Sequence, residues 1–335
     1  MPTRSPILLT HAITMRRHFF GEQAETELAN LGPLATNPGD EAFDAAALIA
    51  AAQRARVIVA DRNTPVPAAV FDALPELVAV VRVAMDIRNI DVAAASAAGV
   101  LVTHAGPGFV AAVAELIVGF MVDLGRGFGA CAQAYHRNER PTPRMGRQLA
   151  GATLGIIGYG HIGRYLARLG LAFGMRVLIH DPYQTPAPPE EAVSFAALLE
   201  QADFVVCVAP ATPQTERLMN ADAFARMRPD AYFINASRGE LVDDDALHAA
   251  LVRNRIAGAA LDVGRDSDQR PALGLAALPQ VIAAPHIGGL TPQASAYQAH
   301  EAVRQTAAIL RGDVPDGAAN AASWTRRAVL PGAPA

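Results

Sequence analysis

The sequence has 335 residues, of which 51% are hydrophobic and 18% charged; this composition is typical of a globular chain, and the length favours two domains. The net charge of −4 and a pI near 6.1 provide no basic surface for nucleic acid, so no nucleic-acid partner is expected. All 28 basic residues are arginine, which excludes mechanisms that need a lysine Schiff base or a phosphate-loop lysine.

The cysteines and the longest apolar stretch bear on where the protein works. Cys131 and Cys207 are too few for a disulfide framework, so we expect a reducing compartment, the cytoplasm. The first 20 residues contain no apolar run long enough for a signal peptide. Glu115 and Asp123 interrupt the apolar stretch 109–125, which argues against a membrane span and a membrane partner. No His, Cys and Asp cluster has ligand spacing, so no metal is expected.

Short runs rich in β-branched residues alternate with alanine-rich segments of helical length. The runs show little period-two alternation, as expected of strands buried on both faces, and the order strand–helix–strand predicts parallel sheets in an α/β fold. The predicted strands lie at 6–10, 56–60, 77–84 and 99–104, and then at 153–158, 176–181, 204–209, 231–237, 258–263 and 280–286. The pattern therefore has two halves, residues 1–103 and residues 150–286.

Two predicted helices connect these halves. Residues 108–124 are typical of a long helix that leads away from the first half. A second helix is expected near the end, because Thr291 suits a helix N-cap, Pro292 suits the first turn and Gly312 suits the residue after the last turn. This second helix would return the chain to the first domain.

A glycine-rich turn between a strand and a helix is the most specific motif. Gly158, Gly160 and Gly163 form G-x-G-x-x-G directly after the predicted strand 153–158. The first glycine permits the tight turn, the second lets the backbone approach a pyrophosphate, and the third lets helix and strand pack closely. Asp181 follows Gly163 by 18 residues, at the end of the next strand. A carboxylate there accepts hydrogen bonds from the ribose hydroxyls and repels a 2′-phosphate, which predicts NAD rather than NADP.

Two further residues with chemical potential follow predicted strands. Arg238 lies just after the strand 231–237, and His286 just after the strand 280–286. In an open parallel sheet, ligands bind beyond the carboxyl ends of the strands. We therefore expect Arg238 and His286 to lie near the glycine turn.

At this point the chain resembles the D-isomer-specific 2-hydroxyacid dehydrogenases, which include glyoxylate/hydroxypyruvate reductases and phosphoglycerate dehydrogenases. The resemblance covers nearly the whole chain and is strongest in GIIGYGHIG, NASRGELVD, GAALDV and PHIGG. It implies two doubly wound parallel-sheet domains, with a Rossmann NAD domain (104–288) inserted into a discontinuous flavodoxin-like substrate domain (1–103 and 289–335). It also implies a homodimer that transfers a hydride between NAD(H) and C2 of a 2-oxo or D-2-hydroxy acid.

The resemblance also implies roles for individual residues. Arg238 looks like the arginine that holds the 2-oxo acid in a bidentate manner, and His286 looks like the acid–base that protonates the keto oxygen. Asp262 looks like the residue that holds the nicotinamide carboxamide. The other expected cofactor contacts, beside the three glycines, Asp181, Arg238 and His286, are the backbone of His161 and Ile162, the loop residues Ala209, Pro210 and Thr215, the nicotinamide neighbours Ala236 and Ser237, and Gly288.

The segment between Asp262 and His286 departs from the family pattern. Family members usually carry a glutamate five residues after this aspartate, and its carboxylate pairs with the histidine. Ser267 occupies that position here. Three residues are candidates to replace the glutamate: Asp266, Asp268 and Gln269. We favour Asp268, because a longer loop compensates for a shorter side chain; that none of the three contacts the histidine stays an alternative. For Arg265 and Arg270, a role as solvated loop residues stays open.

The carboxylate-binding loop departs as well. The family often has G-x-G-x-D-N-I-D where this chain has AMDIRNID, so that Ala84 and Asp86 replace the glycines and Arg88 replaces an aspartate. Asp86 would repel a substrate carboxylate unless Arg88 or Arg62 offsets its charge. These changes, together with Phe109 where asparagine is frequent, predict a 2-oxo acid that is larger or less acidic than glyoxylate.

A second hypothesis belongs to another class of function. The altered loops are also compatible with a catalytically weak NAD(H)-sensing binding or regulatory protein on the same scaffold. Retention of both Arg238 and His286 favours the enzyme.

Overall fold

The structure, a computed structural model, describes residues 6–266 and 268–330. Ser267, which occupies the position of the family glutamate, lies outside the described residues. The chain divides into two compact units: one runs up to Gly108 and resumes at Thr291, and the other is Phe109–Leu290. Residues 104–108 thus belong to the first unit, and residues 289 and 290 to the second.

The first unit is built on a parallel sheet. Within the described residues this sheet has five strands in the order β2-β1-β3-β4-β5, which is the flavodoxin-like order with a switch point between β1 and β3. The strands are β1 (Ile7–Leu9), β2 (Leu34–Thr36), β3 (Val57–Ala60), β4 (Ala79–Arg82) and β5 (Leu101–His104). The sequence predicted four of these strands and missed β2.

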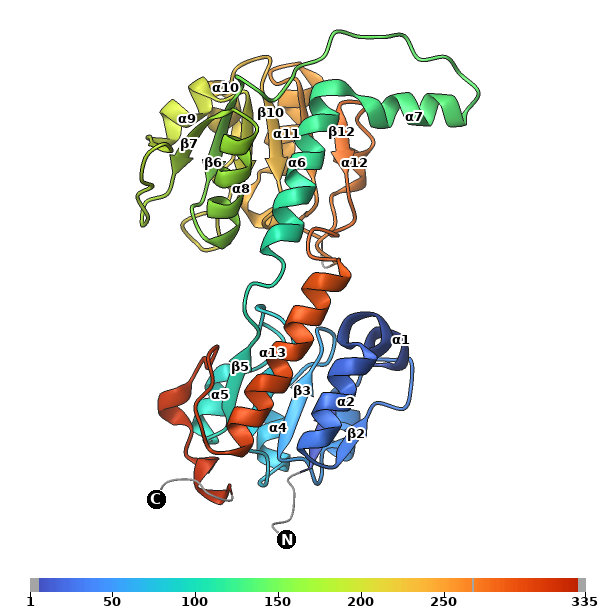
Figure 1. The fold of residues 1–335 in the computed structure, drawn as a ribbon, viewed down its shortest axis with the longest axis vertical. Coiled ribbons are helices and arrows are strands. Elements are labelled where there is room, and N and C mark those ends of the chain that lie inside the picture. Colours follow the sequence, from blue (N-terminus) through green and yellow to red (C-terminus); the bar gives the residue numbers. More distant parts are fainter. Residues whose placement is uncertain (1–5, 267, 331–335) are drawn as a thin grey trace. The chain divides into compact units, whose positions relative to one another are not determined.

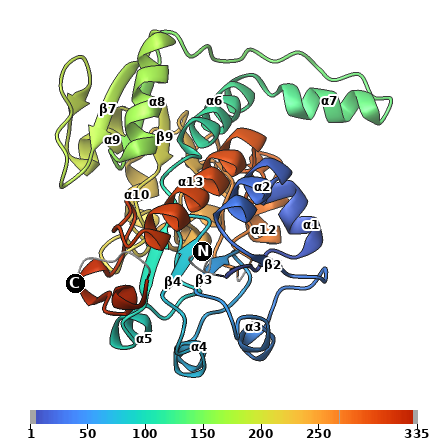
Figure 2. The same ribbon diagram turned by 60° about the horizontal axis from the view of Figure 1, so that its bottom comes forward.

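Helices cover both faces of the first sheet (Figure 2). One face packs against α2 and α13 through residues such as Leu28 and Ala302, and the other packs against α3, α4 and α5 through residues such as Leu48 and Phe71. The helices are α1 (Ile13–Met15), η1, a π-helical turn (Arg16–Phe20), α2 (Glu22–Leu31), α3 (Ala45–Ala51), α4 (Ala68–Ala73), α5 (Val92–Ala97) and α13 (Pro292–Leu310), with short 3-10 turns at Ala321–Ser323 and Arg326–Val329. The predicted cap of α13 is confirmed, since the Ala294 N–H donates to Thr291 Oγ1 at 3.2 Å.

The second unit is built on a larger parallel sheet (Figure 1). Its strands, as far as they are described, follow the order β12-β11-β10-β9-β6-β7-β8, the Rossmann arrangement with its switch point between β6 and β9. They are β6 (Thr153–Ile157), β7 (Arg176–His180), β8 (Glu191–Ala192), β9 (Phe204–Cys207), β10 (Tyr232–Asn235), β11 (Gly258–Leu261) and β12 (Val281–Ala283). The predicted two-sheet α/β fold is confirmed.

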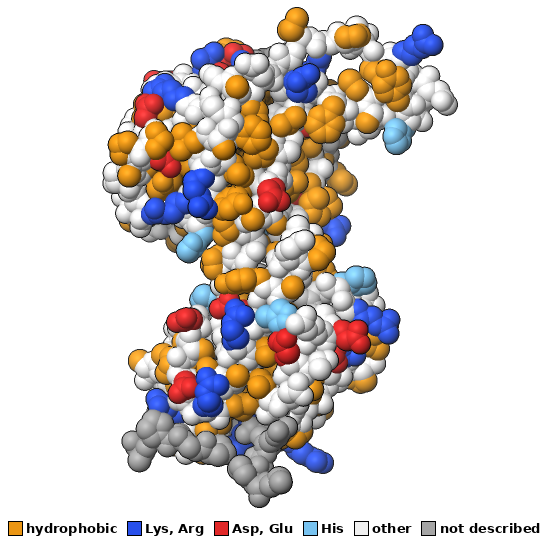
Figure 3. Space-filling model, in the orientation of Figure 1, with side chains coloured by type: hydrophobic (Ala, Val, Ile, Leu, Met, Phe, Trp, Pro, Cys, Tyr) orange, Lys and Arg blue, Asp and Glu red, His pale blue; other side chains and the backbone are white. Residues whose placement is uncertain are grey.

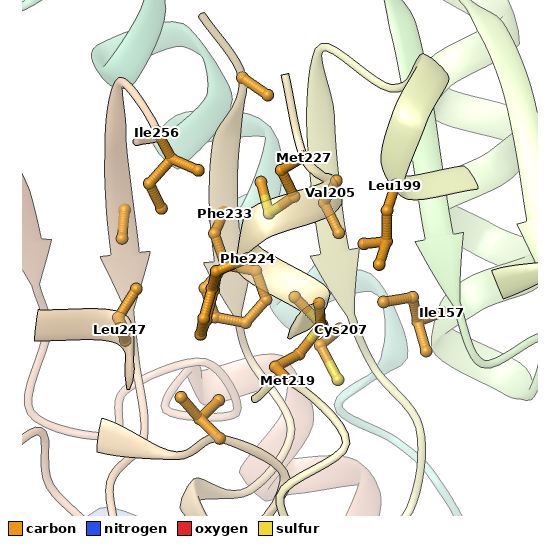
Figure 4. Packing of buried hydrophobic residues seen from close by; sticks show 14 of the residues in the cluster. Ile157, Leu199, Val205, Cys207, Met219, Phe224, Met227, Phe233, Leu247 and Ile256 are labelled. Atoms are coloured by element: carbon orange, nitrogen blue, oxygen red, sulfur yellow. The ribbon is translucent and has the colours of Figure 1, made fainter. Parts of the chain in front are cut away.

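Helices pack on both faces of the second sheet as well. α6 and α8 lie on one face, with Ile117 and Leu166 in the core, and α9, α10 and α11 lie on the other. Figure 4 shows the second of these cores, in which Phe224, Phe233 and Cys207 pack together. The helices are α6 (Val110–Arg126), α7 (Phe128–His136), α8 (His161–Ala172), α9 (Phe195–Gln201), α10 (Ala221–Arg226), η2, a 3-10 turn (Gly239–Leu241), α11 (Asp244–Val252) and α12 (Leu273–Ala276).

The predicted long helix and Cys207 both contribute to these cores. The predicted long helix is present as α6, which buries its apolar side against the sheet. Cys207 is buried within β9, and burial raises the pKa of its thiol to about 12, so it packs as a small apolar side chain. Among the described helices, none combines the length and apolar character that a membrane span requires.

Candidate active site

The glycine turn follows β6 and begins α8. Gly158 has φ +99°, and a Cβ on it would lie 2.7 Å from backbone atoms of Ala209. A Cβ on Gly163 would lie 2.1 Å from the carbonyl oxygen of Gly158. Gly160 differs, because a Cβ there would meet no atom within 4 Å. The outer two glycines are thus required by packing, whereas the exposed central one leaves the backbone open to a ligand.

The first turn of α8 begins directly after the exposed Gly160. Gly160 is the N-cap and has no side chain that could accept a hydrogen bond from the first turn. The N–H groups of His161 and Ile162 therefore lie at a helix N-terminus that no side chain caps, where the helix dipole adds a partial positive charge. This combination suits a diphosphate. The local structure fits the dinucleotide that the sequence predicts.

Asp181 follows β7 and lies beside the glycine turn. Its carboxylate accepts hydrogen bonds from the backbone N–H groups of Tyr159 (2.7 Å), Tyr183 (2.8 Å) and Gln184 (3.0 Å). These three bonds fix a negative charge at the place where the second strand of a Rossmann fold ends. A carboxylate has about four acceptor positions, so one is left for a ribose hydroxyl.

The loop after β9 carries Ala209, Pro210 and Thr215. The Thr215 hydroxyl donates to the Pro210 carbonyl at 2.7 Å and accepts from the Thr212 N–H at 2.8 Å, so it closes the loop on itself. The hydroxyl of Ser237, in the loop after β10, donates to the carbonyl of Ala209. The N–H of Ala236, the residue before it, donates to the Cys207 carbonyl at 3.4 Å. The loops after β9 and β10 are therefore fastened together.

Arg238 directly follows Ser237. Asn235, the last residue of β10, is 1% exposed. Its Nδ2 donates to the Arg238 carbonyl at 2.9 Å, while its Oδ1 accepts from the Ser237 N–H at 3.1 Å. The Arg238 guanidinium donates to the Ser237 carbonyl at 2.8 Å. A buried amide thus holds the backbone of Arg238, a supporting role that the sequence reasoning missed although Asn235 opens the NASRGELVD motif.

His286 follows β12 in an uncommon backbone conformation. Its φ is +59°, a region that few residues other than glycine adopt, and its N–H donates to the Ala284 carbonyl at 3.0 Å. The next two N–H groups, those of Ile287 and Gly288, each donate to a carboxylate oxygen of Asp262 at 2.8 Å. A Cβ on Gly288 would lie 2.8 Å from Asp262 Oδ2, so this close contact requires glycine.

Asp262 therefore shapes the turn that carries His286. The side chain lies at the end of β11 and is 2% exposed. Burial raises the pKa of its carboxyl above the ordinary value, and the two N–H donors oppose that rise. Beyond its bonds to Ile287 and Gly288, the Asp262 carboxylate has about two more acceptor positions, enough to bind a carboxamide. The predicted contact of Asp262 with the nicotinamide carboxamide stays a prediction.

The acid loop, defined here as residues 264–266 and 268–271, forms a compact turn. The Gly264 N–H donates to the carbonyl of Gln269, whose φ is +59°, and the Gln269 N–H donates to the Asp266 carbonyl at 2.7 Å. Asp268 is 54% exposed; its carboxylate accepts from the Arg270 N–H at 3.0 Å and lies 3.4 Å from Arg270 Nε. The pairing of Asp268 with His286 stays a prediction.

The Arg265 side chain forms several hydrogen bonds to other segments of the chain. Its guanidinium donates to the carbonyls of Val242 (2.9 Å) and Glu240 (2.7 Å) and to the carboxylate of Glu216 (2.8 Å). Of the roles that the sequence left open for Arg265, the structure therefore favours a hydrogen-bonded one over a solvated one. Its partners lie 23 or more residues away in sequence, and no local pattern reveals them.

The loop expected to bind the substrate carboxylate lies in the first unit, after β4. Arg88 donates to both carboxylate oxygens of Asp86, with Nη2 at 2.8 Å from Oδ2. Arg88 thus offsets the charge of Asp86, one of the two possibilities raised by the sequence. Asn89 anchors the loop, because its Nδ2 donates to the carbonyls of Asp61 (3.2 Å) and Thr64 (2.7 Å).

The second unit brings most of the predicted cofactor and catalytic residues to one edge of its sheet. Gly158, Asp181, Arg238, Asp262 and His286 all lie at or just beyond the carboxyl ends of parallel strands. In the part of the chain that the structure describes, no three His, Cys, Asp or Glu side chains are grouped so as to hold a metal ion.

Comparison with known proteins points in one direction. Residues 118–288 match the family model described as "D-isomer specific 2-hydroxyacid dehydrogenase, NAD binding domain". The chain is 34% identical over 259 residues to the (S)-sulfolactate dehydrogenase of Chromohalobacter salexigens, covering 75% of this chain and 84% of that protein. It is 32% identical over 275 residues to the D-3-phosphoglycerate dehydrogenase of Methanocaldococcus jannaschii, covering 79% of this chain but 52% of that protein. The chain thus spans about half the length of the phosphoglycerate dehydrogenases it matches.

A solved structure has the same fold. The D-isomer specific 2-hydroxyacid dehydrogenase from Lactobacillus delbrueckii ssp. bulgaricus, in its NAD-complexed form, superposes with a TM-score of 0.82 at 24% sequence identity. The superposition covers 94% of this chain and 99% of that one.

Proposed function

Because the chain belongs to the D-isomer-specific 2-hydroxyacid dehydrogenase family, we propose that it is an NAD-dependent oxidoreductase acting between a 2-oxo acid and a D-2-hydroxy acid. One observation carries the proposal. Arg238 and His286 both lie on turns at the carboxyl end of the sheet whose glycine turn fits a dinucleotide, and each turn is fixed by a buried side chain. An arginine and a histidine held in this way can bind a carboxylate and move a proton.

The cofactor is NAD. When bound, it supplies or accepts the hydride at C2 of the substrate. The residues that would hold the diphosphate are the glycines of the turn and the N–H groups of His161 and Ile162, and Asp181 would bind the adenosine ribose and disfavour NADP. The remaining contacts would come from the loops after β9, β10, β11 and β12: Ala209, Pro210, Thr215, Ala236, Ser237, Asp262 and Gly288.

Arg238 would bind the substrate. Its planar guanidinium can hold one carboxylate oxygen and the keto oxygen of a 2-oxo acid with two parallel hydrogen bonds. The second of these bonds polarises the carbonyl that receives the hydride. Since Asn235 fixes the backbone of Arg238, the side chain starts from a defined position.

His286 would donate a proton to the keto oxygen during reduction and take it back during oxidation. The buried Asp262 carboxylate accepts hydrogen bonds from the two residues after His286 and so fixes the turn that carries the imidazole. Asp268 is the favoured partner that would keep His286 protonated, with Asp266 and Gln269 as alternatives.

The first unit would form the substrate domain, and the second the NAD domain. The loop after β4 has Ala84 and Asp86 in place of two glycines, with Asp86 paired to Arg88 and Met85 exposed. This loop has less room for a small anion close to the backbone and offers an apolar side chain instead. We therefore propose a 2-oxo acid larger or less acidic than glyoxylate.

A panel of 2-oxo acids tests the proposal. NADH oxidation by the wild type should be fastest with substrates that carry an apolar or bulky C3 substituent, and His286→Asn should lower kcat about 100-fold or more. If NADH binds with micromolar affinity but no 2-oxo acid is reduced, the alternative of an NAD(H)-sensing binding protein is favoured. Strong activity on glyoxylate alone would contradict the substrate class.

We further propose a cytoplasmic homodimer. Both cysteines are free thiols in the structure, in keeping with a reducing compartment. α7 and the loop after it stand away from the second sheet (Figure 1) and carry hydrophobic side chains on their surface (Figure 3). Phe128, Tyr135 and Met145 are all exposed there. A second copy related by a twofold axis would cover these side chains, and molar mass from light scattering tests this.

A further inference from the structure

We propose that Arg265 is a positioning residue that holds together the three loops behind the substrate arginine. These are the acid loop after β11, the η2 turn that follows Arg238, and the Glu216–Met219 segment of the loop after β9. The inference rests on the proposed function for its catalytic consequence, but the contacts themselves can be tested without turnover.

The guanidinium of Arg265 makes one contact with each of three partners. Nε donates to the Val242 carbonyl at 2.9 Å, and Nη2 donates to the Glu240 carbonyl at 2.7 Å and to Glu216 Oε1 at 2.8 Å. Its side chain is 29% exposed. A planar fork with fixed donor directions suits three acceptors on two segments, η2 with Val242 and the Glu216 side chain, which a single ammonium group does not match.

The η2 turn and the Glu216–Met219 segment are already joined by their backbones. The Arg217 N–H donates to the Glu240 carbonyl at 2.8 Å, and the Met219 N–H donates to the Leu241 carbonyl at 2.9 Å. The Glu240 carbonyl therefore accepts from both Arg217 and Arg265. Arg265 adds the acid loop to two segments that backbone hydrogen bonds already join.

The acid loop also contacts η2 directly through its backbone. It lies directly against Gly239, where a Cβ would be 2.1 Å from the carbonyl carbon of Gly264 and 2.4 Å from the Arg265 nitrogen. Beneath this contact is a small cavity lined by Gly239, Gly264 and Asp244, among other residues. The hydrogen bonds of Arg265 therefore add a side-chain tie between the acid loop and η2 to this backbone contact.

Charge adds to this tie. Asp243 caps α11, Asp244 and Asp245 begin it, and burial raises the pKa of Asp244 while Arg265 opposes that rise. Replacing Arg265 with a neutral residue would leave these carboxylates facing Asp266 of the acid loop with less positive charge between them. Like charges in that arrangement push the loop away from η2.

The consequence for catalysis follows from sequence position. Arg238 is the N-cap of η2, and Gly239 is in contact with the acid loop. Loosening η2 moves the backbone next to the substrate arginine, and a displacement near 1 Å lowers rates by about 100-fold. Loss of Arg265 should thus weaken 2-oxo acid binding and turnover more than NADH binding, because the diphosphate and ribose contacts of the cofactor would come from the glycine turn and Asp181, which Arg265 does not contact.

The test compares Arg265→Gln, Arg265→Lys and Glu216→Gln with Arg226→Gln as the matched control, since Arg226 forms a surface ion pair with Glu200 in the same unit. Amide hydrogen exchange is measured with and without saturating NAD⁺. We expect exchange in 239–243 to rise about tenfold or more in Arg265→Gln, because bonds worth about 0.5–1.5 kcal/mol each are lost. Glu216→Gln should show a smaller rise, Arg265→Lys an intermediate one, and Arg226→Gln none.

Steady-state kinetics completes the test. Arg265→Gln should lower kcat/KM for the 2-oxo acid about 10- to 100-fold, with the KM for NADH within about twofold, and Arg265→Lys should recover part of the loss. The positioning role of Arg265 would be overturned if amide exchange in 239–243 of Arg265→Gln equalled that of Arg226→Gln. It would also be overturned if kcat/KM fell by the same factor for the 2-oxo acid and for NADH. If the wild type reduces no 2-oxo acid, the proposed function fails, and the exchange data still decide whether Arg265 holds the three loops together.

Discussion

Gly160→Ala separates the fold of the glycine turn from its ligand function. Gly160 has φ −76° and ψ −158°, values that alanine adopts freely. A Cβ there would meet no atom within 4 Å. Alanine loses a little as an N-cap but also restricts the unfolded chain, effects of about 0.5–1 kcal/mol that oppose each other. The free energy of unfolding without cofactor should therefore stay close to that of the wild type.

The same methyl group would stand where a diphosphate approaches the backbone. Keeping the diphosphate from a backbone N–H group removes a hydrogen bond to a charged group, worth about 1.5–3 kcal/mol. The Kd for NADH should then rise about 10- to 150-fold. At a cofactor concentration of about 100 times the wild-type Kd, NADH stabilises the wild type by about 2.7 kcal/mol, and a 30-fold weaker variant by about 0.9 kcal/mol.

Thermal unfolding with and without NADH measures both effects. For a domain of this size the cofactor-induced rise in Tm should fall from about 5–11 °C to about 2–4 °C. Gly274→Ala is the matched control, because a Cβ on Gly274 also meets nothing within 4 Å and α12 lies away from the turn. The reasoning is refuted if Gly160→Ala keeps the full cofactor-induced rise, or if it lowers the Tm of the cofactor-free protein by more than the control does.

Three further outcomes follow from individual side chains. Asp268→Asn should lower the reduction rate about tenfold and shift the pH–rate profile if it pairs with His286; an unchanged profile, or the same loss in Asp266→Asn, counts against that pairing. Asp181→Asn should raise the ratio of NADPH to NADH efficiency about tenfold, equivalent to about 1.4 kcal/mol; a constant ratio would show that this charge does not select the cofactor. His11 is 3% exposed, and burial lowers its pKa from 6.5 to about 4. The unfolded chain therefore takes up a proton first as the pH falls, so the free energy of unfolding should drop by about 3 kcal/mol between pH 6.5 and pH 4, and a denaturant titration of His11→Gln should lack most of this drop.

The strands and the connecting helices could be predicted because each signal is local. Runs such as 204–209 are apolar without alternation, and Thr291 with Pro292 marks the start of α13 by residue type alone. Two strands were missed, β2 with three residues and β8 with two. Neither is buried in the core, so no run of β-branched residues marks them, and they form because a neighbouring strand offers free backbone groups.

The supports of the site could not be predicted, because their partners are distant in sequence. Asp262 reaches the N–H groups of Ile287 and Gly288 over 25 and 26 residues. Arg265 reaches Val242 and Glu240 over a similar span. Only the three-dimensional placement of β10, β11 and β12 as neighbours brings these groups together, so residue type alone could not reveal the partners of Asp262 or of Arg265.

These supports also explain how the acid loop can depart from the family pattern while the site keeps its arrangement. The backbones of Arg238 and His286 are held by Asn235 and Asp262, which are buried at the ends of β10 and β11 and lie outside the acid loop. Under the proposed function, replacing the usual glutamate would therefore leave the backbone of His286 in place and would change the group that pairs with its imidazole. Variation in the acid loop should then move the pH dependence of catalysis, whereas variation at Asn235 or Asp262 should remove the arrangement of the site itself.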